Sequence, residues 1–271
     1  EVCFLLVKDF DDTLALDRMS TTPSALPLGG TVPRSSGRWL KNMPEYIRRA
    51  LNYPQMDVDC TVWQMVYLCL APAKVYRTTK YHRQTKNQWA RDDPAFVALI
   101  VLLMAVSSLA YAIAFHRNLV GFLKAVFFSV VIDFFLAGVA LCTIMWWVAN
   151  SYLKIDSTGT HATEQSVEWM YSFDVHCNSY FPFFMIVNVG QYFLLPLFLR
   201  KGMLWAIFAN LLYCCAGAYY SFVSFLGYDI LPFLQHTTVF LYPIPACAIF
   251  FIITSAMRIN LCRAVMAFYF T

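Results

Sequence analysis

The sequence predicts an all-α membrane protein: a bundle of five transmembrane helices with an N-terminal cytosolic region that is helical and basic. Hydrophobic residues make up 59% of the 271 residues and charged residues only 13%, about half of the roughly 25% that is usual in soluble proteins. Residues 1–93 hold 13 of the 20 Lys and Arg and 10 of the 16 Asp and Glu. The last two thirds of the chain therefore suit a lipid environment.

Five long apolar segments follow residue 93. A helix of about 20 residues crosses a hydrocarbon core, and in lipid only a helix satisfies every backbone group along such a run. Pro243 and Pro245 should kink or break the last segment, and residues 258–271 are expected to form a short C-terminal tail. The predicted spans are about 94–115, 123–149, 180–199, 203–226 and 238–257.

The region before the first span divides into two parts. Residues 1–54 are rich in Ser, Thr, Pro and Gly around 20–37 and are predicted to be a flexible arm. Residues 55–93 combine a helix at 56–71, too short to span and therefore interfacial, with a basic juxtamembrane segment. The side that includes the N-terminus would carry 14 Lys and Arg against 6 on the other side, which favours a cytosolic N-terminus.

One carboxylate, Asp133, falls in the middle of the second span. An ionisable group at this depth is costly and marks a candidate functional site, for a proton, an ion or a lipid headgroup. The simpler interpretation is a polar clamp that holds helices together. Its candidate partners in other spans are Asn188, Gln191 and Asn210.

The loop expected before the third span carries Glu168, Trp169, Asp174 and His176. Asp174 and His176 could approach a metal, but no further His or Cys completes a set of recognisable spacing, so we expect no metal site. The sequence also lacks the GxSxG, HExxH, P-loop and GxGxxG patterns. We therefore expect no enzyme and no cofactor, and an intramembrane enzyme that uses this Asp–His pair is the weakest hypothesis.

The segment from Arg34 to Arg91 holds 11 Lys and Arg, interleaved with Trp and Tyr. The simplest interpretation is a topology signal that contacts anionic headgroups, at about 1 kcal/mol per basic residue near the surface. Docking of an acidic protein surface is a second interpretation, and RNA binding through phosphates and base stacking is a third. The candidate partner-binding residues, with those of the loop, are Lys80, Arg83, Lys86, Trp89, Arg91, Glu168, Trp169, Asp174 and His176.

The run from Gln55 to Phe96 resembles the Unc-fifty family of eukaryotic Golgi membrane proteins, most strongly in QTKNQWARDDPAF, Gln84 to Phe96. The resemblance covers about residues 55–262. Further matches follow in the expected order: Val167–Trp169, Phe173–His176, Phe225–Tyr228, Leu231–Leu234 and Leu241–Pro243.

The resemblance implies a Golgi-resident, five-span protein with a cytosolic N-terminus; the endoplasmic reticulum and the nuclear membrane are alternative locations. It implies a role in vesicular transport, with receptors such as nicotinic acetylcholine receptors as cargo. It also implies a link to the large guanine-nucleotide exchange factors for ARF GTPases. The leading hypothesis is a membrane adaptor with the lipid bilayer and these exchange factors as partners. The alternative is a membrane transporter or lipid-handling protein that uses Asp133.

Overall fold

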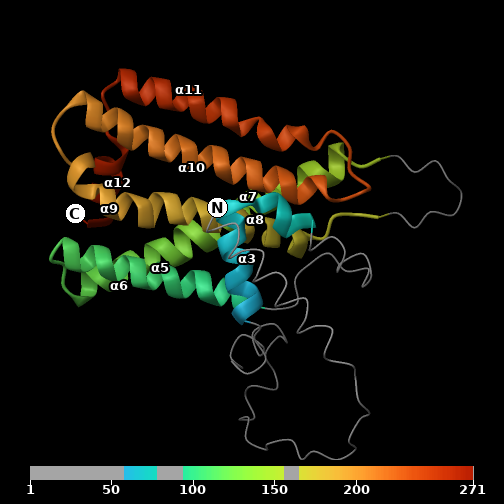
Figure 1. Ribbon diagram of the computed structural model, residues 1–271, viewed down its shortest axis with the longest axis horizontal. Helices are drawn as coiled ribbons and strands as arrows, with labels where there is room; N and C mark the ends of the chain where they lie inside the picture. Colours follow the sequence, from blue (N-terminus) through green and yellow to red (C-terminus); the bar gives the residue numbers. More distant parts are fainter. Residues whose placement is uncertain (1–57, 78–93, 156–164, 271) are drawn as a thin grey trace, which may run out of the picture. The chain divides into compact units, whose positions relative to one another are not determined.

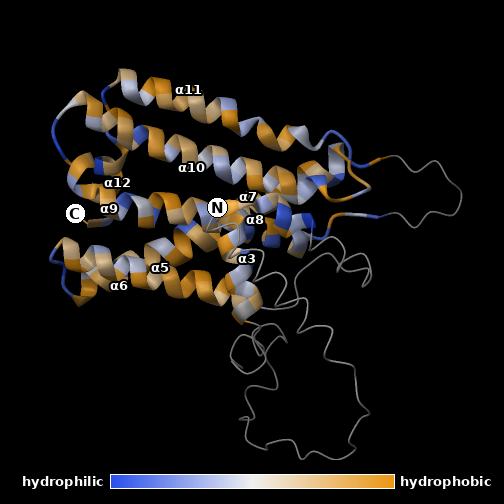
Figure 2. Cartoon of the chain, in the orientation of Figure 1, coloured by the Kyte–Doolittle hydropathy of each residue, from blue (hydrophilic) through white to orange (hydrophobic). Residues whose placement is uncertain are grey.

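A computed structural model describes residues 58–77, 94–155 and 165–270, which all belong to one compact unit, Pro44–Thr271. Five of its helices are long and apolar enough to cross a membrane. They lie side by side as a bundle (Figure 1), with apolar residues along every span (Figure 2). The predicted fold class is confirmed, and the chain is a multi-pass membrane protein. The spans are Ala95–Ala114, Leu119–Tyr152, Trp169–Phe198, Met203–Asp229 and Thr237–Ala256.

The first and fourth spans are single α-helices, whereas the fifth is divided. The two single helices are α5 (Ala95–Ala114) and α10 (Met203–Asp229). In the fifth span a short 3-10 helix, η5 (Thr237–Leu241), precedes α11 (Pro243–Ala256). Pro243 stands in the first turn of α11, where its missing N–H costs no hydrogen bond, so the expected break falls at this proline.

The second and third spans change their winding part-way along. Each consists of an α-helix, a π-helical segment and a second α-helix. The second span has 34 residues, which at about 1.5 Å per residue extend over roughly 51 Å, so it must tilt in or protrude from a core about 30 Å thick. The segments are α6 (Leu119–Phe127), η3 (Phe128–Leu136) and α7 (Ala137–Tyr152), then α8 (Trp169–Phe184), η4 (Met185–Gly190) and α9 (Gln191–Phe198).

The third span begins at Trp169, whereas the sequence places its start near residue 180. The first turns of α8 are rich in polar residues, which lower the apparent hydropathy of this stretch. They are compatible with a span because α8 packs against α7 and α10, so that nearly all its side chains are buried in protein. For example, the Ser224 hydroxyl of α10 donates to Ser179 Oγ over 2.9 Å. Helix-to-helix bonds of this kind suit membrane bundles.

One end of the bundle carries residues 153–155 and 165–168 and the turn between the fourth and fifth spans. There the amide of Gln235 donates to the Leu153 carbonyl over 2.8 Å. Tyr228 stacks on Phe240 with ring centroids 4.1 Å apart. These contacts tie the two loops together and close this end with an apolar cluster.

Two short helices, with a helical turn at residues 72–77, complete the described chain. Near the end just described, α3 (Val58–Leu70) packs on α8 and α5, and the Tyr219 hydroxyl of α10 donates to the Leu68 carbonyl over 2.8 Å. At the opposite end, α12 (Leu261–Phe270) follows the fifth span and turns back to pack on α6, α9 and α10 (Figure 1). Its terminal Phe270 stacks on Tyr111 of α5, within a second apolar cluster.

Candidate functional site

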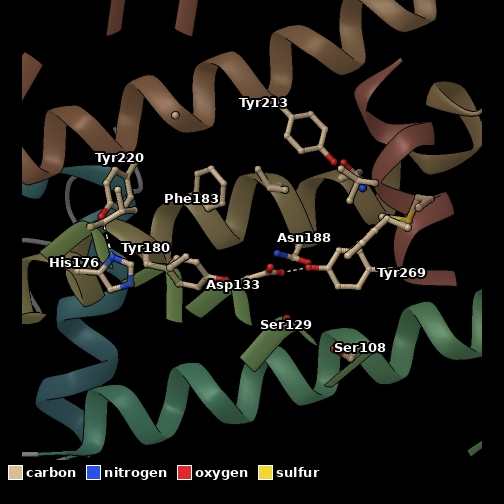
Figure 3. A pocket seen from close by; sticks show the side chains of 18 of the residues that line it. Ser108, Ser129, Asp133, His176, Tyr180, Phe183, Asn188, Tyr213, Tyr220 and Tyr269 are labelled. Carbon is tan, nitrogen blue, oxygen red and sulfur yellow. Dashed lines mark hydrogen bonds between the residues drawn. The ribbon is translucent and has the colours of Figure 1, made fainter. Parts of the chain in front are cut away.

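A cavity of about 630 Å³ lies inside the bundle, between the two apolar end clusters. Every span and α12 contribute to its wall (Figure 3). Its volume falls in the range of small-molecule sites, about 300–1,000 Å³. The wall is mostly apolar, and its polar side chains are Ser108, Tyr111, Ser129, Asp133, His176, Tyr180, Asn188, Gln191, Tyr213, Tyr220, Ser221 and Tyr269.

Both π-helical segments line this cavity. At the end of η3 the amide of Ala137 donates to the carbonyl of Ile132, five residues back instead of four, and the same spacing occurs at the end of η4. The extra residue widens the turn, and such segments occur frequently at functional sites. Asp133 lies in η3 and Asn188 lies in η4, so each segment supplies a polar side chain to the wall.

Asp133 receives its hydrogen bond from outside the five spans. The hydroxyl of Tyr269, on α12, donates to Oδ2 of Asp133 (Figure 3). The Tyr269 ring also contacts Phe128 of η3 edge-on, with ring centroids 6.4 Å apart. The C-terminal helix therefore completes the environment of a carboxylate that belongs to the second span.

His176 is the second titratable group in the wall. Its Nδ1 lies 2.9 Å from the Tyr220 hydroxyl, and its ring packs beside Phe134 and Tyr180, with centroids 5.7 and 5.6 Å away. The side chain is only 1% exposed. On its remaining side the ring lies against Gly138 of α7, where a residue with a Cβ would collide with the imidazole.

The amides that the sequence pairs with Asp133 take other positions. Among the described residues Asp133 hydrogen-bonds Tyr269 and none of the three amides. Asn188 and Gln191 line the cavity, and the backbone carbonyl of Asn188 accepts a hydrogen bond from the Tyr111 hydroxyl over 2.9 Å. These two amides add polar groups to the same wall without a hydrogen bond to the carboxylate.

Asn210 lies away from the cavity, at the turn that leads into α12. Its Nδ2 donates to the Ile259 carbonyl over 2.8 Å, and its Oδ1 accepts from the Leu261 amide over 3.0 Å. The side chain is 1% exposed. Asn210 thus fixes the start of the helix that carries Tyr269.

Comparisons with known proteins place this chain in a family. A profile of the UNC-50 family matches residues 46–270. The chain belongs to the UNC-50 family. It is 49% identical over 237 residues to the protein unc-50 homolog of Dictyostelium discoideum, covering 87% of this chain and 90% of that one. It is 37% identical to protein unc-50 of Caenorhabditis elegans (84% and 74% covered) and 34% identical to the human protein unc-50 homolog (83% and 86% covered). No solved structure matches it.

The segments that carry the UNC-50 resemblance converge in the described structure. Val167, Val175, Tyr228 and Leu231 belong to four different matched segments, and all four side chains are buried in one apolar cluster. The Tyr171 hydroxyl adds a hydrogen bond to the Gly227 carbonyl at the same place. The matched residues therefore build the end of the bundle at which Tyr76 also lies.

The candidate partner-binding residues fall into three groups. On α8, Asp174 and His176 are buried inside the bundle. Glu168, at the N-cap of α8, is exposed, and Trp169 is half-buried, with its indole N–H donating to Thr143 Oγ1 over 3.1 Å. The structure thus leaves Glu168 at the surface and Trp169 half-buried, and it places the other two in the interior. The others, Lys80, Arg83, Lys86, Trp89 and Arg91, lie outside the described residues.

Sequence reasoning missed the tyrosines of the cavity. Tyr180, Tyr220 and Tyr269 direct their hydroxyls toward His176 or Asp133 (Figure 3), yet tyrosines near the ends of apolar segments usually mark the membrane interface. Their one signal is a hydroxyl group within an apolar run, which alone does not separate a wall residue from an interfacial one. In the described part of the chain, no group of three or more His, Cys, Asp or Glu side chains is arranged to hold a metal ion.

Proposed function

We propose that this UNC-50 family member is a Golgi membrane protein that acts in vesicular trafficking, as an adaptor linked to ARF guanine-nucleotide exchange factors and to receptor assembly or surface delivery. Family membership supports this proposal, because the resemblance of Gln84 to Phe96 implies that role. The docking surface would combine the basic segment, from Lys80 to Arg91, with Glu168 and Trp169.

The observation that carries the docking proposal is the position of the residues that flank the basic segment. Tyr76, just before it, packs close to Gly227 of α10, whose position also adjoins Val175 of α8. The Tyr171 hydroxyl, in the first turn of α8, bonds the Gly227 carbonyl. Tyr76, which precedes the basic segment, and the start of α8, with exposed Glu168, thus lie at the same end of the bundle. A partner could contact both segments at once.

Charge reversal tests the adaptor role. In cells depleted of the protein, we expect the ARF exchange factor to leave Golgi membranes, and wild type to restore it. The triple variant Arg83→Glu, Lys86→Glu, Arg91→Glu should fail to restore it, because it replaces three cations of the proposed surface with anions. The measurement is fluorescence imaging of the exchange factor.

The matched control reverses three cations at the opposite end of the bundle: Arg117, Lys201 and Arg258. It should restore recruitment, since it leaves the proposed surface intact and increases the positive bias that holds the N-terminal side in the cytosol. Labelling of exposed Cys60 by a membrane-impermeant thiol reagent verifies the topology of both variants. An exchange factor that stays on the Golgi after depletion contradicts the adaptor role.

The cavity favours a second candidate function, a membrane transporter or lipid-handling protein that uses Asp133. An intramembrane carboxylate that faces a cavity, and not a neighbouring helix alone, is the arrangement expected at a substrate or ion pathway. In reconstituted vesicles we expect flux of protons or of a fluorescent lipid with the wild type, and at least a tenfold loss with Asp133→Asn or Asp133→Leu. Equal flux in the variants, or none with the wild type, removes this candidate.

A further inference from the structure

The charge of the cavity wall is unbalanced. Among the described residues that line it, Asp133 is the one carboxylate, and none is Lys or Arg. The other titratable side chains in the wall are His176, which bonds Tyr220, a set of tyrosines, and Cys247. A carboxylate at this depth requires a compensating proton or cation. The wall is therefore electrostatically complementary to a positively charged ligand, and it repels an anionic ligand.

Aromatic rings and neutral polar groups surround the carboxylate. Tyr180 and Tyr269 lie beside Asp133 in the wall (Figure 3), and Phe183 packs against Tyr180 with ring centroids 5.9 Å apart. The faces of such rings attract a cation within about 6 Å, an interaction that strengthens when water is excluded. Ser129 and Asn188 line the cavity near the same carboxylate and can hydrogen-bond an ammonium group or a hydroxyl next to it.

The mouth of the cavity faces lipid. Four wall residues are also exposed: Ala137 and Leu141 of α7 (Leu141 40%), Pro243 of α11, and Phe268 of α12 (65%). The fifth span packs mainly on α10 and is the least buried of the five spans. A ligand would thus enter sideways from the bilayer, past apolar side chains, which selects for a membrane amphiphile over a water-soluble molecule.

We propose that the cavity binds a single-chain amphiphile with a primary amine headgroup. The ammonium pairs with Asp133 among the tyrosine rings, and the hydrocarbon chain runs along the apolar wall to the lipid-facing mouth. Tyr269 positions the carboxylate through its hydroxyl. The volume of about 630 Å³ suits one chain and not a two-chain phospholipid. This inference rests on the second proposed function and names the class of its substrate.

Competition with three ligands of one chain length tests the proposal. The full-length protein in nanodiscs of zwitterionic lipid is photolabelled with diazirine-bearing sphingosine, and octadecylamine, octadecanol and octadecanoate compete. We expect octadecylamine to compete at least tenfold better than octadecanol, octadecanoate not to compete, and the labelled peptides to come from η3, α11 or α12. Equal competition by the acid or the alcohol, or labelling confined to other peptides, overturns the proposal.

Variants identify the headgroup acceptor. Asp133→Asn should weaken octadecylamine at least tenfold while leaving octadecanol within about twofold. The control Asp229→Asn removes a carboxylate at the end of α10 that accepts from Thr237 Oγ1 over 2.8 Å and does not line the cavity; it should change neither affinity. If Asp133→Asn does not fold, the wild-type competition series decides alone. Binding of the amine without flux contradicts only the transport function, whereas flux without amine binding contradicts only this ligand class.

Discussion

Gly138→Ala is expected to destabilise the bundle by about 3 kcal/mol, because the new methyl group would collide with the His176 imidazole, which neighbouring side chains hold in place. The added Cβ would lie 2.7 Å from Cδ2 of His176 and would also overlap Nε2. The imidazole is held on its other side by Tyr220 and by the rings of Phe134 and Tyr180. For a chain of this size the loss corresponds to a drop of roughly 6–12 °C in Tm, measured by thermal unfolding in detergent.

A double-mutant cycle shows whether the collision with His176 is the cause. In a His176→Ala background the methyl group has room, so Gly138→Ala should cost at least about 1 kcal/mol less there than in wild type. Gly190→Ala is the matched control, since its added Cβ would meet only the Met185 carbonyl oxygen, at an ordinary 3.5 Å, and it should be neutral or slightly stabilising. Equal melting of Gly138→Ala and wild type would show that the ring can shift.

The existence of five spans could be predicted because span length and apolarity are local properties of the chain. The start of the third span could not, because the polar side chains of α8 face protein, and that depends on packing against α7 and α10. The π-helical turns around Asp133 and Asn188 have the same origin. Their hydrogen-bond shift by one residue follows from how the long helices fit their neighbours, and no residue type in these runs specifies it.

The candidate site was predictable in its residues more than in its contacts. The sequence identifies Asp133, Asn188 and Gln191 as polar residues in apolar runs, and all three line the cavity. It does not reveal Tyr269 as the partner of Asp133, because the ten residues of α12 are too short to be predicted as a membrane span. For the same reason it pairs Asn210 with the carboxylate, since without α12 the sequence gives no sign of the turn that Asn210 binds.

Asn210→Leu is expected to release α12 from the bundle, at a cost of about 3 kcal/mol. The substitution keeps the number of heavy atoms and the branch at Cγ but leaves the partly buried Ile259 carbonyl and Leu261 amide without their partner. Each buried group left unsatisfied costs about 1–3 kcal/mol. Cys262 reports the release. Burial raises the pKa of its thiol to about 11, so at pH 7.5 it reacts slowly with maleimide, because the thiolate is the reactive form.

When α12 leaves its site, the Cys262 thiol meets water and its pKa returns toward the ordinary value of about 8.5, so the labelling rate should rise at least tenfold. Mass spectrometry separates this cysteine from Cys60 and Cys215, which are exposed in the folded protein. The control Asn118→Ala removes a side-chain cap of α6 at the same end of the bundle and should leave the Cys262 rate unchanged. A faster Cys262 rate in both variants would indicate general loosening of that end. An unchanged rate in Asn210→Leu would show that the apolar contacts of α12 hold this helix in place without the amide. Because Tyr269 is on α12, a faster Cys262 rate in Asn210→Leu alone would also mean that Asn210 controls the hydrogen bond to Asp133 from outside the cavity.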